Sequence, residues 1–256
     1  MNEINPHVSD ALFDVSGQVC LIAGAGGGLG RAIAKALDKR GAQLILLDID
    51  AAALDRLHLD VPGARIEVAD IKNEAAISNV VSSIVEQNGR LDGAVNAAGE
   101  LPIASADTLD EAVFRQCIDV NLTGAFLFSR CAAKAMQVHG GRIVHIASVS
   151  SFVANAGYAA YASSKAALAQ LVRVLAREWA PANILVNAIG PALTETLLTK
   201  DYLSDPTFRK NAISMIPMGR LGEPEDLIGT TLLLLAQGGA FITGQTIYVD
   251  GGRTLV

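Results

Sequence analysis

The stretch Val19-Cys20-Leu21-Ile22-Ala23-Gly24-Ala25-Gly26-Gly27-Gly28-Leu29-Gly30 is typical of a buried strand that runs through a glycine-rich turn into a helix. Residues 19–23 form the apolar run of a strand buried on both faces, and a helical period begins within the glycines at Leu29. Such a turn lets the backbone approach a pyrophosphate, whose charge a helix N-terminus favours. The glycine spacing is G-x-x-x-G-x-G, not G-x-G-x-x-G. The stretch predicts that a dinucleotide contacts Gly24, Gly28, Leu29 and Gly30. The alternative is a tight turn with a purely structural role.

Composition favours a single domain that acts on a small molecule. The 256 residues are 51% hydrophobic, enough for a core covered on both faces of a sheet, and the formal net charge is -6. Without a basic stripe, a nucleic-acid partner is not expected. The longest apolar runs are too short for a membrane span, so we expect a cytoplasmic protein that does not associate with membranes. The scattered cysteines and histidines, His145 among them, predict core packing and no metal site.

Short apolar runs alternate with amphipathic ones along the whole chain, which predicts an α/β fold with a doubly wound parallel sheet. The expected strands cover 19–23, 44–48, 65–69, 93–97, 142–147, 184–189 and 246–249. The expected helices cover 29–40, 51–57, 74–88, 109–138, 158–179 and 225–236. Residues 1–12 are expected to form a loose arm. Residues 191–223 follow the carboxyl end of a strand and are expected to form a lid over a substrate, or else a packed surface excursion.

Asp48 closes the second expected strand, where a carboxylate can accept both hydroxyls of an adenosine ribose and repel a 2′-phosphate. No Lys or Arg precedes Gly30 in the glycine turn, so the sequence predicts NAD as the cofactor. A helix N-cap is the alternative for Asp48. Asp70, followed by Ile71, closes the third expected strand and is interpreted as a contact near the adenine ring or as a helix cap.

Tyr161 and Lys165 stand one helical turn apart, so both side chains project from one helix face. Free tyrosine has a pKa near ~10, and a neighbouring ammonium is expected to lower it and to permit proton exchange at neutral pH. Chance spacing is the alternative. Tyr158 is roughly 10 Å along the helix axis from Lys165, too far for such tuning, and is expected to form a wall of the substrate pocket or to pack half-buried. Ser148 follows a strand end, where its hydroxyl can hold a substrate oxygen.

Two asparagines stand at notable places. Asn96 lies at the end of the fourth expected strand, within Asn96-Ala97-Ala98-Gly99, and Asn121 lies inside an expected helix. An amide side chain in mid-helix competes with the backbone and weakens the helix. The position of Asn121 therefore indicates either a specific role or, as is common, an exposed side chain.

Taken in order, these motifs and the closing Asp250-Gly251-Gly252 resemble those of the short-chain dehydrogenase/reductase superfamily over nearly the whole chain. The resemblance implies a seven-stranded Rossmann sheet, a nicotinamide cofactor and Tyr161 as the acid/base. It implies that Lys165 lowers the Tyr161 pKa and holds the nicotinamide ribose, that Ser148 orients the substrate oxygen and that Asn121 anchors a water. Further cofactor contacts are expected at Asn96, Ala97, Gly99, Pro191 and Thr196. Ala23 and Ala192 depart from the family pattern, which has threonine and glycine there.

The expected activity is hydride transfer between NAD and a secondary alcohol or ketone, and no metal takes part. The chain resembles sugar-acid dehydrogenases and 3-oxoacyl-carrier-protein reductases, and the absence of a basic cluster favours a small free substrate over a carrier protein. The resemblance also implies a homotetramer. A non-catalytic sensor or scaffold that binds NAD is the competing class, although it has no need for Ser148, Tyr161 and Lys165 together.

Overall fold

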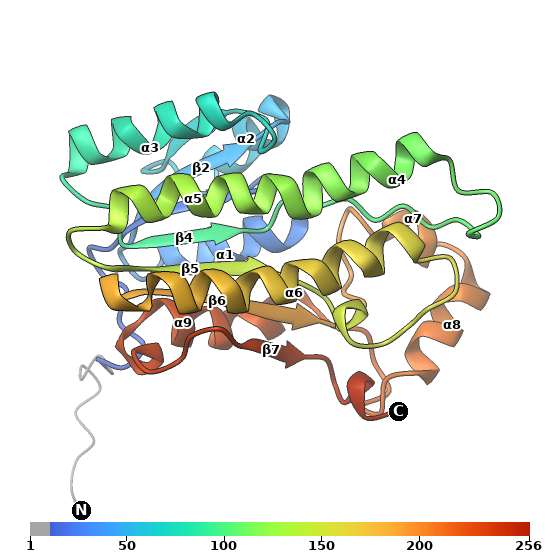
Figure 1. Ribbon diagram of the computed structural model, residues 1–256. Coiled ribbons are helices and arrows are strands. Elements are labelled where there is room, and N and C mark those ends of the chain that lie inside the picture. Colours follow the sequence, from blue (N-terminus) through green and yellow to red (C-terminus); the bar gives the residue numbers. More distant parts are fainter. Residues whose placement is uncertain (1–10) are drawn as a thin grey trace, which may run out of the picture.

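The computed structural model describes residues 11–256, which form a parallel sheet between two layers of helices (Figure 1). The spatial order of the seven strands is β3-β2-β1-β4-β5-β6-β7, so the winding direction reverses between β1 and β4. This is the doubly wound topology that the sequence predicts. The strands are β1 Val19–Ala23, β2 Gln43–Asp48, β3 Arg65–Val68, β4 Gly93–Asn96, β5 Gly141–Ile146, β6 Ile184–Pro191 and β7 Thr246–Val249.

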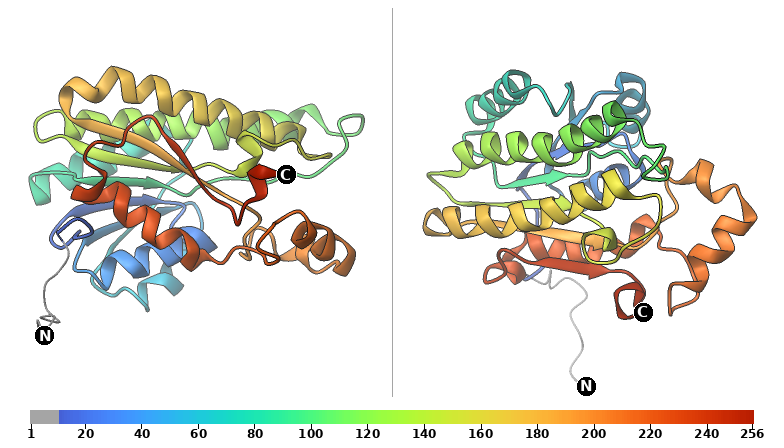
Figure 2. Two further views of the ribbon diagram at one scale, coloured as in Figure 1. Left: turned by 90° about the horizontal axis from the view of Figure 1, so that it is seen from below. Right: turned by 45° about the vertical axis from the view of Figure 1, so that its right-hand side comes forward.

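The helices cover both faces of the sheet (Figure 2). Both faces need cover because successive side chains of a strand point to opposite faces of the sheet. In β1, Leu21 packs in one core cluster and Ile22 in the other. One cluster holds α3 Glu74–Asn88, α5 Ala125–Met136 and α6 Ala159–Trp179 against the sheet. The other holds α1 Gly28–Asp38, α2 Ala51–His58 and α9 Ile228–Leu235. No described helix is long and apolar enough to cross a membrane.

The expected helix at 109–138 is wrong as a single element. The structure has α4 Glu111–Ile118, then a π-helical turn Asp119–Gly124, then α5. Asn121 lies inside this π turn, and its side chain bonds the backbone of Glu100. That contact joins residues 21 apart in sequence, so helical periodicity does not reveal it.

The segment 191–223 contains two short helices that the sequence analysis did not predict, α7 Lys200–Leu203 and α8 Pro206–Ser214. They pack with Val149 in a small third core cluster at the carboxyl edge of the sheet. The expected helix at 225–236 begins with a 3₁₀ turn, Pro224–Leu227, before α9. The expected arm, residues 1–12, lies outside the described residues except for Ala11 and Leu12.

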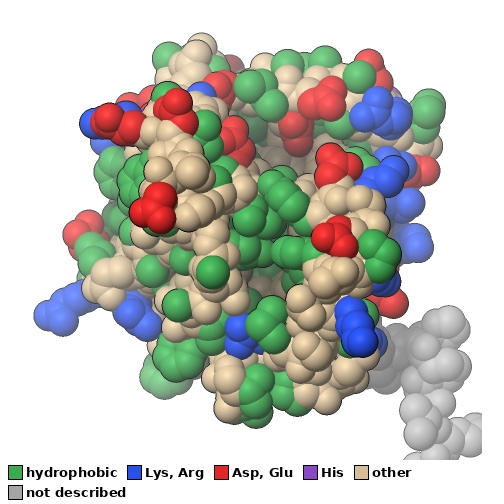
Figure 3. Space-filling model, turned by 90° about the vertical axis from the view of Figure 1, so that its right-hand side faces the viewer, with side chains coloured by type: hydrophobic (Ala, Val, Ile, Leu, Met, Phe, Trp, Pro, Cys, Tyr) green, Lys and Arg blue, Asp and Glu red, His purple; other side chains and the backbone are tan. Residues whose placement is uncertain are grey.

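The carboxyl ends of the strands lie at the right-hand edge of the molecule in Figure 1, on the same side as α7 and α8. Viewed from that side, the surface is hollowed, and hydrophobic side chains line the hollow (Figure 3). Since ligands of doubly wound sheets bind outside the carboxyl ends of the strands, we expect the functional site at this edge.

Candidate active site

The glycine turn between β1 and α1 is packed too closely for side chains. A Cβ at Gly30 would lie 2.1 Å from the Gly24 carbonyl oxygen. Gly24 has φ +71°, and a Cβ there would lie 2.4 Å from the Ala98 nitrogen. Gly27, the N-cap of α1, supplies no side-chain hydrogen bond to the first turn. The first N–H groups of α1 are therefore left to bind an anion.

Asp48 is tied to this turn. Its Oδ2 accepts a 2.9 Å hydrogen bond from the Gly26 nitrogen, and its Oδ1 accepts one of 3.0 Å from the Asp50 nitrogen. The alternative role as a helix N-cap falls to Asp50, whose side chain caps α2. Asp48 thus lies at the end of β2 with its carboxylate against the glycine turn, as a ribose contact requires.

Asp70 and Ile71 line the same cavity as the glycine turn and Asp48. The Asp70 Oδ1 accepts a 2.8 Å hydrogen bond from the Lys72 nitrogen, so the carboxylate stabilises the turn after β3. It does not cap α3, because Asn73 does. Both residues therefore lie in one cavity with the glycine turn and Asp48.

Two cavities meet over the glycine turn. One, of about 500 Å³, is lined by the glycine turn, Asp48 and Asp70. The other, of about 330 Å³, is lined by Ser148, Tyr161 and Lys165. Residues common to both linings are Leu29, Ala97, Ala98, Gly99, Thr196 and Leu198. A single long ligand can therefore extend from Asp48 to the side chains expected to carry the chemistry.

Ser148, Tyr161 and Lys165 meet in the smaller cavity. Ser148 follows β5 in extended conformation, and its Oγ accepts a 3.0 Å hydrogen bond from the Ser150 nitrogen. Tyr161 lies in the first turn of α6. Lys165, one turn further, is buried, with its Nζ 5.7 Å from the centre of the Tyr161 ring. Its ammonium donates a 2.8 Å hydrogen bond to the Ile146 carbonyl oxygen.

The expected direction of the Tyr161 pKa is wrong. Burial raises this pKa to about 12, although a hydrogen bond with Ser148 acts in the opposite direction. Burial also lowers the pKa of Lys165 to about 8. The reason is that burial removes water from both groups and so disfavours the charged form of each. Tyr161 is therefore a neutral phenol at neutral pH.

Tyr158 immediately precedes α6, and its ring meets that of Tyr161 edge to face with centroids 5.9 Å apart. The cavity that contains Tyr161 is also lined by Tyr158, as expected for a wall residue. Burial raises the pKa of Tyr158 as well.

Asn121 is buried, so solvent exposure does not explain its place in the helix. Its Oδ1 accepts a 2.8 Å hydrogen bond from the Glu100 nitrogen, and its Nδ2 donates to the Glu100 carbonyl oxygen at 2.9 Å and to Ser164 Oγ at 3.0 Å. Neither cavity lining includes Asn121. It lies behind Gly99, where a Cβ would be 3.2 Å from Asn121 Oδ1 and 3.5 Å from Lys165 Nζ. Asn121 thus supports the loop between the two cavities.

Asn96 does not line either cavity. It is buried, and its Oδ1 accepts a 3.1 Å hydrogen bond from the Ala98 nitrogen. Its Nδ2 lies 3.3 Å from His145 Nδ1, and His145 Nε2 lies 2.8 Å from Ser129 Oγ. Asn96 therefore holds the loop whose members Ala97 and Gly99 line both cavities, and it makes no contact with the cavity space itself.

The segment after β6 covers the cavities. Pro191 ends β6, Ala192 is buried, and both line the smaller cavity. Thr196 lines both cavities and packs against the glycine turn, since a Cβ at Gly28 would lie 2.7 Å from its Cβ.

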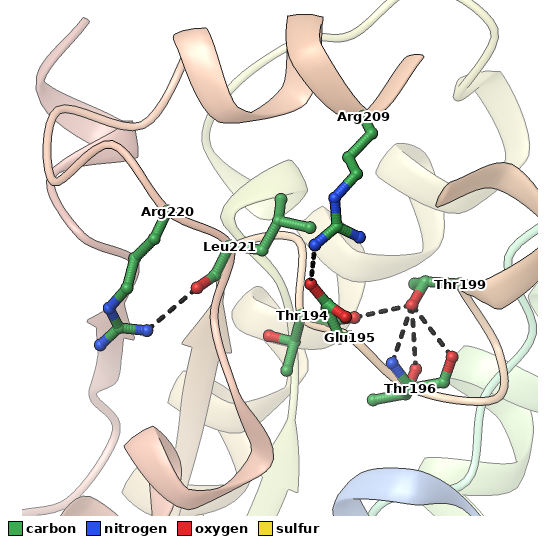
Figure 4. Close-up of polar contacts among 7 residues, drawn as sticks. All are labelled: Thr194, Glu195, Thr196, Thr199, Arg209, Arg220 and Leu221. Atoms are coloured by element: carbon green, nitrogen blue, oxygen red, sulfur yellow. Dashed lines mark hydrogen bonds and ion pairs between the residues drawn. The ribbon is translucent and has the colours of Figure 1, made fainter. Parts of the chain in front are cut away.

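Figure 4 shows how this segment is braced. Thr199 Oγ1 donates to the Thr194 carbonyl oxygen at 2.7 Å and accepts from the Thr196 nitrogen at 3.0 Å, and an ion pair joins Glu195 to Arg209 of α8. In the described residues, Leu197 and Met218 are exposed and Leu203 is buried, so the segment has both a packed part and an open apolar part.

Sequence reasoning missed several residues that line the smaller cavity. Four of them come from α8 or the 3₁₀ turn Arg253–Leu255: Phe208, Asn211, Ala212 and Arg253. Local signals for a helix at 206–214 existed in Asp205 and Pro206, an N-cap followed by proline. Within residues 11–256, no group of three His, Cys, Asp or Glu side chains could hold a metal ion.

Comparison with known proteins identifies relatives over nearly the whole chain. The family model described as Enoyl-(Acyl carrier protein) reductase matches residues 24–254. The NAD-dependent glycerol dehydrogenase of Listeria innocua is 34% identical over 96% of this chain and 97% of its own. The 3-oxoacyl-[acyl-carrier-protein] reductase FabG of Thermotoga maritima is 34% identical over 94% of this chain and 99% of its own. A gluconate 5-dehydrogenase from Burkholderia cenocepacia, crystallised with NADP and tartrate, superposes with a TM-score of 0.90 at 29% identity, covering 96% and 98%.

Proposed function

Because the chain belongs to the short-chain dehydrogenase/reductase superfamily, we propose that it transfers hydride between NAD and a secondary alcohol or ketone, with Tyr161 as acid/base. The observation that carries the proposal is the junction of the two cavities, with Asp48 and the glycine turn in one and Ser148, Tyr161 and Lys165 in the other. A dinucleotide and a small substrate can thus meet within reach of the Tyr161 phenol.

The residues of the larger cavity fit a dinucleotide. The α1 N-terminus would hold the pyrophosphate, because its first N–H groups lack a side-chain cap and the glycines leave room for close approach. Asp48 would accept the ribose hydroxyls, and Asp70 with Ile71 would lie beside the adenine. Thr196 and Pro191 would contact the other end, which also lies beside Lys165. When bound, the nicotinamide supplies the hydride acceptor or donor.

Tyr161 would exchange the proton with the substrate oxygen. Because burial keeps the phenol neutral, its hydroxyl can donate a proton to a carbonyl oxygen that becomes an alkoxide as hydride arrives. Ser148 Oγ would donate a hydrogen bond to the same oxygen and polarise the carbonyl bond. In the oxidative direction the tyrosine must first lose its proton, so oxidation is expected to speed up as the pH rises.

The charges around Asp48 favour NAD over NADP. A 2′-phosphate would meet the Asp48 carboxylate. The two Lys or Arg side chains that line this cavity have partners, since Arg56 lies 4.0 Å from the Asp50 carboxylate and Lys72 lies 3.7 Å from that of Asp70. Arg31, which follows Gly30, pairs with Asp60. A free cation that would hold the extra phosphate is missing from these positions.

The catalytic proposal is tested by a spectrophotometric screen at 340 nm, the absorbance of reduced nicotinamide. NAD and NADP are each offered with polyols, sugar acids, hydroxysteroids and short hydroxyacyl thioesters. Turnover of at least one small alcohol with NAD supports the proposal. Tight NAD binding without turnover of any member would favour a non-catalytic sensor, and turnover of thioesters alone would favour a reductase of carrier-bound 3-oxoacyl groups.

A further inference from the structure

One cationic side chain of the smaller cavity has no part in the proposed proton transfer. Arg253 lies in the 3₁₀ turn Arg253–Leu255, far along the chain from the tyrosine, yet it lines the same cavity as Tyr161. The lining contains two cations, Lys165 and Arg253, and no Asp or Glu. The lining therefore supplies two positive charges and no Asp or Glu carboxylate.

The guanidinium of Arg253 makes three hydrogen bonds. Its Nη1 donates to a main-chain oxygen of Val256, the last residue of the sequence, at 3.0 Å, and its Nη2 donates to Asn155 Oδ1 at 3.1 Å and to the Met215 sulfur at 3.7 Å. Among residues 11–256 it forms no ion pair with an Asp or Glu. The nearest acid in sequence, Asp250, instead accepts hydrogen bonds from Gly252 and Thr254.

Arg253 can bind a bidentate partner if it gives up its weakest contact. A guanidinium has five N–H donors, and the contacts above use one hydrogen of Nη1 and both hydrogens of Nη2. The Met215 sulfur, a weak acceptor at 3.7 Å, is the partner that such a ligand would replace. A carboxylate matches the fork of such a group with two parallel N–H···O bonds. Since Asn155 and Val256 hold the guanidinium at the cavity wall, the side chain is already ordered for such a ligand.

Two glycines before Arg253 allow the backbone to turn towards the cavity. Gly251 and Gly252 both have positive φ, +59° and +90°. A Cβ at Gly251 would lie 2.7 Å from the Ile216 side chain, so only glycine lets the turn pack against the residues that follow α8. The turn thereby carries Arg253 from the end of β7 to the cavity formed under α8.

Most of the rest of the cavity wall near α8 is apolar, and Asn211 of α8 is its polar member. The apolar members are Val149, Leu193, Phe208, Ala212, Met215 and Ile216. Such a wall suits a substrate with few hydroxyl groups, because it offers few partners for them.

We propose that Arg253 is a specificity-determining residue that binds a carboxylate of the substrate. The preferred substrates are then oxo- and hydroxycarboxylates with a largely apolar body, the carbonyl or carbinol carbon near Tyr161 and the carboxylate at Arg253. This inference rests on the proposed oxidoreductase function and narrows its substrate class.

The test compares each acid with its own methyl ester, which keeps the carbonyl and removes the charge. Acetoacetate and levulinate, and their methyl esters, are reduced with NADH by the full-length protein, by Arg253→Gln and by Arg253→Lys. We expect wild type to prefer acid to ester in kcat/KM by about tenfold or more, as for loss of one charged hydrogen-bond pair. Arg253→Gln should bring that ratio close to one, mainly through KM, and Arg253→Lys should keep part of it.

Arg177→Gln is the matched control, because Arg177 is exposed on α6 and outside the cavity lining. It should keep the wild-type ratio. A structural role for Arg253 would lower the rates on acid and ester together and leave the ratio unchanged, which would overturn the inference. Equal wild-type rates on acid and ester, or use of the esters alone, would overturn it too, while the oxidoreductase function would stand. Absence of any NAD-dependent turnover in the wider screen would instead refute the proposed function.

Discussion

The Lys165 ammonium donates a 2.8 Å hydrogen bond to the carbonyl oxygen of Ile146, the last residue of β5. Ser148 follows Ile146 by two residues, and Tyr161 lies one helical turn before Lys165. This bond therefore fixes the start of α6 against the strand end that carries Ser148. The three side chains expected to act together are held by a contact that needs no ligand.

Replacing Asp48 with Asn should relax the preference for NAD. The amide oxygen of Asn can still accept the hydrogen bond from Gly26, so the glycine turn keeps its anchor while the negative charge is lost. We expect the ratio of kcat/KM for NAD over NADP to fall by about tenfold or more. Asp50→Asn makes the same charge change two residues away and should have a smaller effect. A wild-type enzyme that prefers NADP would refute the role given to Asp48.

Replacing Asn121 with Leu should destabilise the fold. The backbone N–H and carbonyl of Glu100 would lose their buried partners, at a cost of about 1–3 kcal/mol in the free energy of unfolding. Urea denaturation measures this. Asn88→Leu, at an exposed position of α3, should change the unfolding free energy by no more than about 0.5 kcal/mol. Equal stabilities for wild type and Asn121→Leu would show that the π turn does not depend on the Glu100 contact.

His145 should make the protein sensitive to acid. Burial, with a smaller effect from the Lys165 charge, lowers the pKa of His145 from 6.5 to about 3. The unfolded chain therefore binds a proton that the folded chain does not, and stability is lost as the pH falls from 6.5 towards 3. In His145→Asn this loss should be smaller, as measured by denaturation at several pH values, with the exposed His139→Asn as control. An identical pH dependence in His145→Asn and wild type would mean that another group is responsible.

The Glu195–Arg209 ion pair should matter for the segment 191–223 more than for global stability. Both side chains are more than one-third exposed, so removing the pair with Glu195→Gln should change the unfolding free energy by less than about 1 kcal/mol. Because Glu195 adjoins Thr196, which lines both cavities, the KM of the substrate should rise by at most about fivefold with little change in kcat. A large loss of stability with unchanged KM would instead assign the pair a structural role.

The strands and the ends of the strands could be predicted because each is a local signal. An apolar run followed by a polar or glycine residue placed Gly24, Asp48, Asn96 and Ser148 at one edge of the sheet, and the structure has them there. The doubly wound character follows from the same pattern, since helices must cover both faces of a parallel sheet, whereas the order of the strands comes from the structure.

Features that depend on distant contacts were not predictable in this way. The π turn needs Glu100 beside Asn121, and the role of Asn96 needs His145 from a neighbouring strand. The raised pKa of Tyr161 reflects burial by several elements, whereas the sequence shows only the neighbouring Lys165. Arg253 reaches the cavity through two glycines with positive φ, a path that composition does not show.

The Tyr161→Phe variant tests whether the Tyr161 hydroxyl exchanges the proton with the substrate oxygen. Removing one hydroxyl leaves the ring, its packing against Tyr158 and the whole dinucleotide cavity in place. NAD should bind with a Kd close to that of wild type, while kcat with any substrate found in the screen should fall by about 10²-fold or more, as for loss of a general acid. Tyr158→Phe should lose far less. Turnover by Tyr161→Phe at the wild-type rate would show that Tyr161 is not the acid/base.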